Sequence, residues 1–455
     1  MKSIRQKQKL AFLFTSPLYV RNYIENKTLD NLMLDKDNLI IFQNCSSPEL
    51  FTGQSVKIKN LSFIQKIRYQ LAEKLKSRVN QNKAKSFITR MRREKIYFFQ
   101  VIKNLKNFKQ KSIIITLIQF IIPLFIYKLG LGNFGIRLLA KKKENKILSK
   151  LLKEKGIDIL VIPSGGAEAE MHYALESCKI CSVKSVLIID NWDNLSSKSV
   201  LIHKPNRMMV WGAQMADHAK EIQGMKYQQI YEIGCSRFET YYKKTDKIKV
   251  INDPYILFVG MACQFDEKRI LQQIDNEISL NKKLPENLKI LYRPHPWQKN
   301  PGNIREDDFK NLILDPQIKN HYKNGVWKID FQPSLSYYPS LIKGAELVIG
   351  GASTFLIEAT IMKKNYIVIA IKEKINNSID DSYSILNSYT HLEGIRNFKF
   401  IEFCYQYEDI INLIEKVSSK KLSNKDVDQF INYYAGNNEF ERYEKRFINS
   451  MEELF

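Results

Sequence analysis

Short apolar runs alternate along most of the chain with longer stretches of helical spacing. A run of four to eight apolar residues bounded by turn residues is typical of a buried strand. In the first half, the predicted strands are Lys9–Phe14, Asn38–Phe42, Ser55–Ile58, Ile157–Ile162, Ser185–Ile189, Arg207–Trp211 and Gln229–Ile233. Amphipathic helical stretches follow most of them, and this alternation predicts an α/β protein with a parallel sheet.

The alternation then starts afresh. A polar run leads to Asp253-Pro254, which marks a linker, and the strands predicted after it are Tyr255–Val259, Lys289–Tyr292, Trp327–Phe331, Leu347–Ile349 and Tyr366–Ala370. A chain of 455 residues favours two domains. We expect Rossmann-like domains over residues 1–245 and 254–435. A final amphipathic helix within 436–455 is expected to pack back on the first domain.

One segment, about residues 60–150, departs from this pattern. It is helical by composition and strongly basic: the residues from Lys57 to Lys150 include 24 Lys and Arg but only 3 Asp and Glu. Its local charge of +21 leaves only +2 of the formal +23 for the rest of the chain. The sequence therefore predicts a basic helical insertion in the N-terminal domain.

Within this insertion, Ile113–Tyr127 is almost wholly apolar and has lysines on both sides. It is shorter than the roughly 18–20 residues of a membrane-spanning helix. A span would also place strands of one sheet on opposite sides of a bilayer. A buried core helix and a segment lying in the membrane interface remain, and the flanking lysines favour attachment to anionic lipid. Nucleic acid is not expected, because aromatic residues are not interleaved as a stacking platform.

Composition limits the compartment. Hydrophobic residues make up 44% of the chain, which excludes a fully membrane-embedded protein. The N-terminal apolar run is too short for a signal peptide. Six cysteines in a chain of this length indicate a reducing compartment. We expect a cytoplasmic protein, peripheral on the inner face of the cell membrane.

The stretch from Gly350 to Thr354 joins a buried strand to a helix. Gly350 and Gly351 permit a tight bend and a close approach to a ligand, and Ser353 and Thr354 are natural N-cap residues. A helix start carries free N–H groups and a partial positive charge, so it suits a phosphate. Glu358, about one turn further on, could reach a ribose hydroxyl or could equally be a solvated helix residue.

A second polar cluster, Arg293-Pro294-His295-Pro296, follows another predicted strand. The prolines fix the backbone around the histidine. An imidazole beside an arginine suits a phosphate or pyrophosphate. Ligands of open α/β sheets bind beyond the carboxyl ends of the strands, which is where both clusters lie.

These motifs resemble those of bacterial GT-B glycosyltransferases of surface polysaccharide synthesis. Similar patterns occur in capsule enzymes of the polysialyltransferase and Kdo-transferase kind and in CDP-glycerol polymerases of teichoic acid synthesis. The resemblance covers mainly Ile157–Ala370. It implies two Rossmann-like domains facing across a cleft, with His295, Pro296, Ser353 and Thr354 binding the nucleotide of an activated donor.

Sugar transfer also requires a group that takes the proton of the acceptor hydroxyl. We expect it in the N-terminal domain. Asp190 and Asp193, after the strand Ser185–Ile189, are preferred to Glu168, Glu170 or His172. No Asp-x-Asp pair follows a strand in the way that a metal-dependent GT-A enzyme needs, so transfer without a metal or cofactor is expected.

The sequence thus predicts a glycosyltransferase that moves a sugar from a nucleotide-activated donor to a surface polysaccharide or lipid-linked acceptor, with inversion as the resemblance implies. One alternative is a CDP-glycerol-type polyol-phosphate transferase. Others are an enzyme like the nucleotide-sugar 2-epimerases, which act on a soluble donor and do not need the basic insertion, and a non-catalytic protein that binds membranes or nucleic acid.

Overall fold

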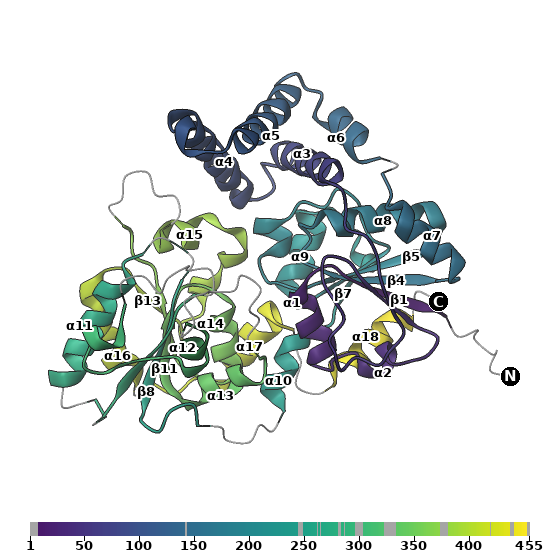
Figure 1. Cartoon of the computed structure of the whole chain (residues 1–455). Coiled ribbons are helices and arrows are strands. Elements are labelled where there is room, and N and C mark those ends of the chain that lie inside the picture. Colours follow the sequence, from purple (N-terminus) through teal and green to yellow (C-terminus); the bar gives the residue numbers. More distant parts are fainter. Residues whose placement is uncertain are drawn as a thin grey trace. The chain divides into compact units, whose positions relative to one another are not determined.

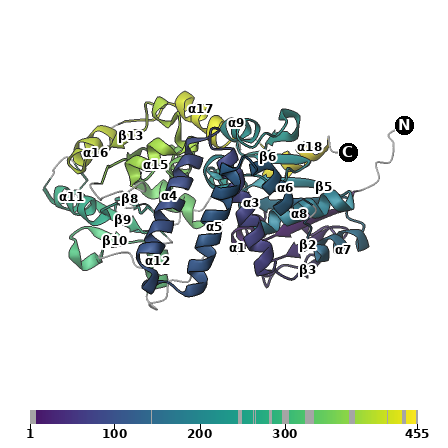
Figure 2. The same ribbon diagram turned by 90° about the horizontal axis from the view of Figure 1, so that it is seen from above.

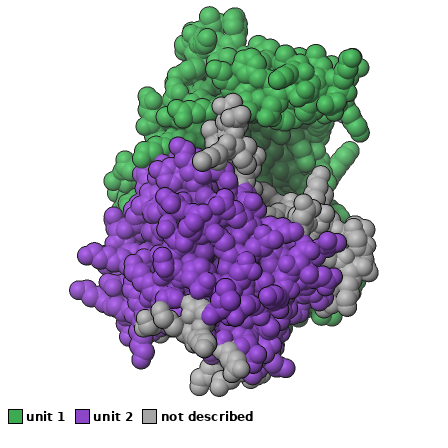
Figure 3. Space-filling view, turned by 90° about the vertical axis from the view of Figure 1, so that its left-hand side faces the viewer, with its two compact units in different colours: residues 1–236, 441–455 green, residues 237–440 purple. Residues whose placement is uncertain are grey.

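The computed structural model describes residues 8–141, 143–243, 249–261, 263, 265–280, 284–285, 287–295, 304–322, 334–373, 381–418, 420–436 and 441–452. The chain divides into two compact units. Unit 1 comprises residues 1–236 and 441–455, and unit 2 comprises residues 237–440 (Figure 3). Each unit is built around its own parallel sheet.

The sheet of unit 1 has seven strands in the order β3-β2-β1-β4-β5-β6-β7, all parallel. The strands are β1 (Leu10–Phe14), β2 (Leu39–Phe42), β3 (Ser55–Lys57), β4 (Ile159–Ser164), β5 (Lys184–Ile189), β6 (Arg207–Val210) and β7 (Ile230–Glu232). All seven match predicted runs. The order reverses between β1 and β4, which is a topological switch point.

Helices cover both faces of this sheet (Figure 1). They are α1 (Pro17–Tyr19), α2 (Asp30–Met33), α7 (Lys146–Glu154), α8 (Ala169–Cys181), α9 (Ala213–Glu221) and α18 (Tyr443–Met451). The last of these comes from the end of the chain. In α18, Phe447 is fully buried and lies 6.4 Å from Phe12 of β1 between ring centroids, and Glu444 accepts the backbone N–H of Leu32 at 3.0 Å. The last helix therefore completes the core of unit 1.

Unit 2 has a six-stranded parallel sheet in the order β10-β9-β8-β11-β12-β13. Its strands are β8 (Tyr255–Val259), β9 (Lys289–Arg293), β10 (Leu312–Leu314), β11 (Ala345–Gly350), β12 (Tyr366–Ile369) and β13 (Glu402–Cys404). In sequence order this is 3-2-1-4-5-6, the order of a Rossmann fold. The predicted strand Trp327–Phe331 lies outside the described residues, and the edge strands β10 and β13 were not predicted.

The helices of unit 2 connect these strands. They are α10 (Glu239–Tyr242), α11 (Glu267–Leu280), α12 (Pro316–Tyr322), α13 (Tyr337–Gly344), α14 (Thr354–Ile361), α15 (Ser382–Ser388), α16 (Ile410–Ser418) and α17 (Asn424–Tyr434). α13 precedes β11 and α14 follows it. Both place side chains near the point where the strand order reverses, between β8 and β11.

The basic insertion of unit 1 forms four helices: α3 (Phe63–Val79), α4 (Lys85–Lys103), α5 (Gln110–Lys128) and α6 (Gly132–Ala140). Figure 2 shows α3, α4 and α5 side by side. α3 begins with a capping box between Ser62 and Gln65. It is attached to α8 by an ion pair between Lys66 and Glu170 at 3.2 Å.

The apolar helix α5 is not a core helix. Ile114 is 49% exposed and Phe125 is 62% exposed. Along the part of the chain that the structure describes, no helix is long and apolar enough to cross a bilayer. The exposed side chains show that one face of α5 is open to solvent.

Candidate functional site

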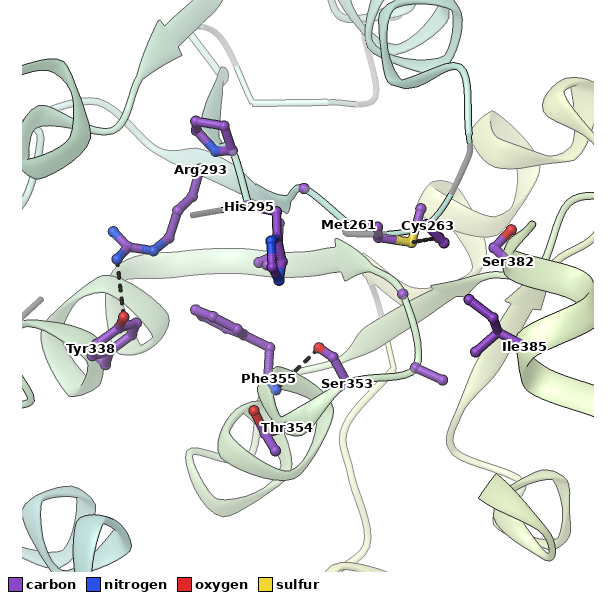
Figure 4. Close-up of a pocket in the computed structure, with 15 residues that line it drawn as sticks. Met261, Cys263, Arg293, His295, Tyr338, Ser353, Thr354, Phe355, Ser382 and Ile385 are labelled. Carbon is purple, nitrogen blue, oxygen red and sulfur yellow. Dashed lines mark hydrogen bonds between the residues drawn. The ribbon is translucent and has the colours of Figure 1, made fainter. Parts of the chain in front are cut away.

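A cavity of about 350 Å³ lies at the topological switch point of unit 2 (Figure 4). Three segments that follow strands form its wall: Val259 to Met261 after β8, Arg293 to His295 after β9, and Gly351 to Phe355 after β11. Its volume falls within the ~300–1,000 Å³ typical of small-molecule sites. Parallel strands therefore bring together residues that lie far apart in the sequence.

The N-terminus of α14 forms one side of the cavity. Ser353 is the N-cap residue, with extended backbone angles, and its Oγ accepts the N–H of Phe355 at 3.3 Å. Thr354 opens the helix. The remaining N–H groups of the first turn and the helix dipole give this end a partial positive charge. This geometry suits a phosphate group.

Gly351 is required by packing at the same turn. A Cβ atom on this residue would lie 2.5 Å from Sδ of Met261. The close neighbour is thus a protein side chain of the cavity wall. A larger residue would push Met261, which lines the cavity.

The loop after β9 forms the opposite side. Arg293 is buried and forms an ion pair with Asp315, and it also donates to the Tyr338 hydroxyl at 3.1 Å. Burial alone would lower the pKa of Arg293, but Tyr338 and Asp315 raise it above its usual value. The guanidinium is therefore charged but partly neutralised by Asp315.

His295 leaves this loop toward the N-terminus of α14. Figure 4 shows its imidazole lying between Arg293 and the side chains of Ser353 and Phe355. Among the described residues that line the cavity, none is Asp or Glu. A half-buried imidazole, a helix start and no lining carboxylate favour an anionic ligand.

Five of the residues predicted for donor binding line this cavity: Arg293, His295, Gly351, Ser353 and Thr354. Gly350 ends β11 and is not part of the lining. Glu358 is also outside it: its carboxylate is buried and accepts the Tyr241 hydroxyl at 2.9 Å. Burial and this carboxylate raise the pKa of Tyr241, so the phenol keeps its proton. Pro296 lies outside the described residues.

Several lining residues were missed by sequence reasoning: Gly260, Met261, Cys263, Tyr338, Ser382 and Ile385. The first three follow β8 directly. The sequence offered one signal for them: the predicted strand Tyr255–Val259 is followed by Gly260. The end of the first strand of a Rossmann fold lies at the switch point, where ligands bind. No local signal marks Tyr338 or the residues of α15.

In unit 1, a polar cluster occupies the switch point between β1 and β4. The carboxylate of Glu168 accepts the hydroxyls of Tyr19 and Ser164 and the N–H of Gly165 at 3.0 Å. Burial and the neighbouring Glu168 raise the pKa of Tyr19, so its phenol remains a donor. Glu168 is half-buried, and its carboxylate is held by three donors.

The two preferred aspartates follow β5, one strand further along the sheet. Asp190 is 1% exposed, and both of its oxygens accept the amide of Asn22 at 3.0 Å. Asp193 is 22% exposed and forms an ion pair with Lys198 at 2.8 Å. Asp190 is thus fixed inside the unit, and Asp193 shares its charge with a lysine.

Glu170 and His172 lie on α8. Glu170 is buried, accepting the amide of Asn44 at 2.6 Å. The His172 ring stacks on Tyr69 at 4.8 Å between centroids. Burial, with the nearby His203, lowers the pKa of His172 to about 3. This imidazole is therefore neutral at physiological pH and enclosed by the helical insertion.

No protein-family model matches the chain. Among curated proteins, the periplasmic chaperone PpiD of Buchnera aphidicola subsp. Schizaphis graminum is 22% identical over 331 residues, covering 67% of this chain and 51% of PpiD. The chain therefore spans about half the length of the curated relative that it matches. This identity is too low to show a family.

Two solved structures resemble the whole chain. The S. aureus MnaA–UDP structure has a TM-score of 0.50 and 9% identity, covering 98% of this chain and 97% of that one. A Listeria monocytogenes protein assigned as a UDP-N-acetylglucosamine 2-epimerase has a TM-score of 0.54 and 8% identity, covering 99% and 97%. At this identity the likeness shows the fold alone. It confirms the predicted class of two Rossmann-like α/β domains of the GT-B type.

Proposed function

We propose that this chain transfers a sugar from a nucleotide-activated donor to a surface polysaccharide or lipid-linked acceptor. The observation that carries the proposal is the cavity at the switch point of unit 2, between His295 and the start of α14. Its volume suits a nucleotide, and its polar groups suit a diphosphate. The donor is a substrate, and the proposal includes no cofactor.

The reaction is a single displacement. The acceptor oxygen attacks the anomeric carbon and forms the new glycosidic bond, while the bond from that carbon to the donor phosphate breaks and its electron pair stays on the phosphate oxygen. His295 and the N–H groups of α14 stabilise the charge that develops there. Configuration at the anomeric carbon inverts, and no metal takes part. The cavity lining offers no carboxylate ligand among its described residues.

The proton of the acceptor hydroxyl passes to a carboxylate of unit 1. Sequence reasoning prefers Asp190 or Asp193, but the geometry favours Glu168. Glu168 lies at the switch point of the sheet and is half-buried, whereas Asp190 is 1% exposed and held by Asn22. A base must reach the hydroxyl that it deprotonates.

Three isosteric variants separate these candidates: Glu168→Gln, Asp190→Asn and Asp193→Asn. We expect Glu168→Gln to lower kcat at least a hundredfold while leaving nucleotide binding intact, since the donor site lies in unit 2. If only Asp190→Asn or Asp193→Asn abolishes turnover, the base is the aspartate and the assignment to Glu168 is wrong.

The proposed setting is the cytoplasmic face of the cell membrane, where a lipid-linked or growing polysaccharide acceptor is available. The proposed partners are the donor, the acceptor and an anionic membrane surface, without nucleic acid. A polyol phosphate in place of the sugar would use the same nucleotide cavity.

A second candidate is a nucleotide-sugar 2-epimerase. The resemblance to a structure that bears this assignment supports it at the level of the fold. An epimerase changes the sugar and releases no nucleotide as its product. The two functions are therefore distinguished by following both the nucleotide and the sugar of the same donor.

The donor site is tested by titrating the protein with CMP, CDP and UDP in a calorimeter. We expect one nucleotide to bind, and His295→Ala and Ser353→Ala to weaken it at least tenfold. Ser423→Ala is a matched control, because Ser423 is the N-cap of α17 in the same unit and does not line the cavity. Binding that survives both cavity variants, or no binding of any nucleotide, would sink the proposal.

A further inference from the structure

The outer face of α5 is an apolar stripe. Between residues 113 and 127 every exposed side chain is apolar. These residues are Ile114, Ile118, Ile121, Ile122 and Phe125. Their spacing of four, three, one and three residues places them along one side of a helix. Such a face is costly to leave in water, because it exposes a contiguous apolar surface.

The opposite face of α5 packs against other helices of the insertion. Phe120 stacks on Phe98 of α4 with ring centroids 4.3 Å apart, and Gln119 donates to Gln70 of α3 at 2.6 Å. Pro123 is buried. α5 therefore has two apolar faces. One packs on α3 and α4, and this packing holds the other, the stripe, toward solvent.

Exposed apolar side chains continue along the sequence beyond the end of α5. Four further apolar side chains on the turn and on α6 are between 48% and 68% exposed. They are Leu129, Leu131, Phe134 and Leu138. Two glycines allow α6 to pack closely here, since a Cβ on Gly135 would lie 2.7 Å from Leu75 of α3. The stripe and these four residues together are called the α5–α6 surface.

Basic side chains lie before, within and after this surface in the sequence. All are exposed, and no ion pair is seen for them within the described residues. They are Lys103, Lys106, Lys109, Lys128, Arg137 and Lys141. The acidic residues of α3 and α4 do not offset them. Glu73 pairs with Arg90, and Glu94 pairs with Arg78 at 3.0 Å and with Lys74 at 3.1 Å.

We infer that the α5–α6 surface docks on an anionic lipid surface, lying in the interface without crossing it. Its apolar residues enter the boundary between headgroups and acyl chains, and its lysines contact lipid phosphates. Charge argues against a second copy as the occupant, because two segments that each carry +21 would repel. The inference deepens the proposed function, because it names the surface that would contact the proposed membrane partner. It is argued from residues of unit 1, so it can fail while nucleotide binding and sugar transfer by the same chain remain.

The test is flotation of the full-length protein with vesicles of phosphatidylglycerol and phosphatidylcholine, and with phosphatidylcholine alone. We expect binding to the anionic vesicles that weakens with salt. The double variant Ile118→Glu and Phe125→Glu should reduce binding at least tenfold. Replacing Lys103, Lys106 and Lys109 with alanine should also weaken it and flatten its salt dependence. Ile147→Glu is the matched control, because Ile147 is 47% exposed on α7, outside this surface.

Circular dichroism and the thermal unfolding midpoint of each variant check that unit 1, which carries the substitutions, is folded. The inference would be overturned if the wild type and the double variant bound anionic vesicles equally well. It would also be overturned if the wild type bound neutral vesicles as well as anionic vesicles. A third contradicting result is a wild-type protein that does not bind vesicles and is a dimer, while the double variant is a monomer. The apolar stripe would then be covered by a second copy of the chain.

Discussion

At the scale of single residues, Gly260 sets the position of the loop that carries His295. A Cβ atom at this position would lie 2.8 Å from the backbone nitrogen of His295 and 3.0 Å from Cα of Pro294. Backbone atoms cannot rotate aside as a flexible side chain can. Gly260 therefore holds the loop close to the end of β8, where the cavity is formed.

Gly260→Ala is expected to push this loop away from the cavity and to weaken nucleotide binding at least tenfold, or about 1.4 kcal/mol. Calorimetric titration measures the effect. The control is Gly130→Ala, since no atom lies within 4 Å of a Cβ at Gly130, although its positive φ of 72° predicts some loss of stability. Unchanged binding by Gly260→Ala would show that the loop position does not matter.

His172 makes the stability of unit 1 depend on pH. Its pKa is about 3 in the fold and about 6.5 in an unfolded chain, so only the unfolded state takes up its proton between these values. The stabilisation is complete above pH 6.5 and is lost as the pH falls toward 3. At pH 5 the loss is about 2 kcal/mol.

The variant His172→Phe keeps a ring against Tyr69 but cannot take up a proton. We expect its free energy of unfolding, measured in denaturant at pH 7 and pH 5, to fall about 2 kcal/mol less than that of wild type. Equal losses in the two proteins would mean that His172 is protonated in the folded state as well.

The sequence located residues that line the cavity of unit 2 but not their partners. His295 and Ser353 were found from motifs that follow strands. Turn and N-cap residues act on neighbouring positions of the chain, so a short stretch of sequence is enough to recognise them. The ion pair of Arg293 with Asp315 joins residues 22 positions apart, and the bond of Tyr19 to Glu168 spans 149 positions. Such pairs depend on strand order, which an apolar pattern does not specify. This is why Glu168 ranked below Asp190 in the sequence.

At the scale of elements, buried strands were predicted well, whereas two of the four edge strands, β10 and β13, were not; the equally short edge strands β3 and β7 of unit 1 were predicted. β8 is wholly buried and therefore reads as a continuous apolar run. β10 and β13 have three residues each, and both are partly exposed at the edges of the sheet. Short half-buried strands lack the run length that reliably distinguishes a strand from a loop.

The helix α18 shows how much one element from the end of the chain contributes to unit 1. Phe447→Ala removes a fully buried ring that packs near Phe12, so we expect a loss of about 3–5 kcal/mol in the free energy of unfolding. Ile448→Ala on the same helix, at a position 40% exposed, should change it by less than about 1 kcal/mol. Similar effects of both variants would mean that α18 is not part of the core.

At the scale of the whole molecule, each of the two units places its polar residues where the strand order reverses. In unit 2 this point holds the cavity with His295 and Ser353, and in unit 1 it holds Glu168 with Tyr19. The alternation of strands and helices was sufficient to predict this architecture. The insertion was predicted from its charge, but the exposed stripe of α5 needed the packing of α3 and α4 to be known.

The central claim is acceptor-dependent transfer from a nucleotide donor. It is tested by incubating the protein with CMP-, CDP- and UDP-linked donors, with and without a lipid-linked oligosaccharide, while following the free nucleotide and the donor sugar. We expect one nucleotide to be released only when acceptor is present, in step with a product of inverted anomeric configuration. Two results would contradict the proposed transfer. One is nucleotide release that does not depend on the acceptor, and the other is a change of configuration at C2 of the sugar while the nucleotide stays attached.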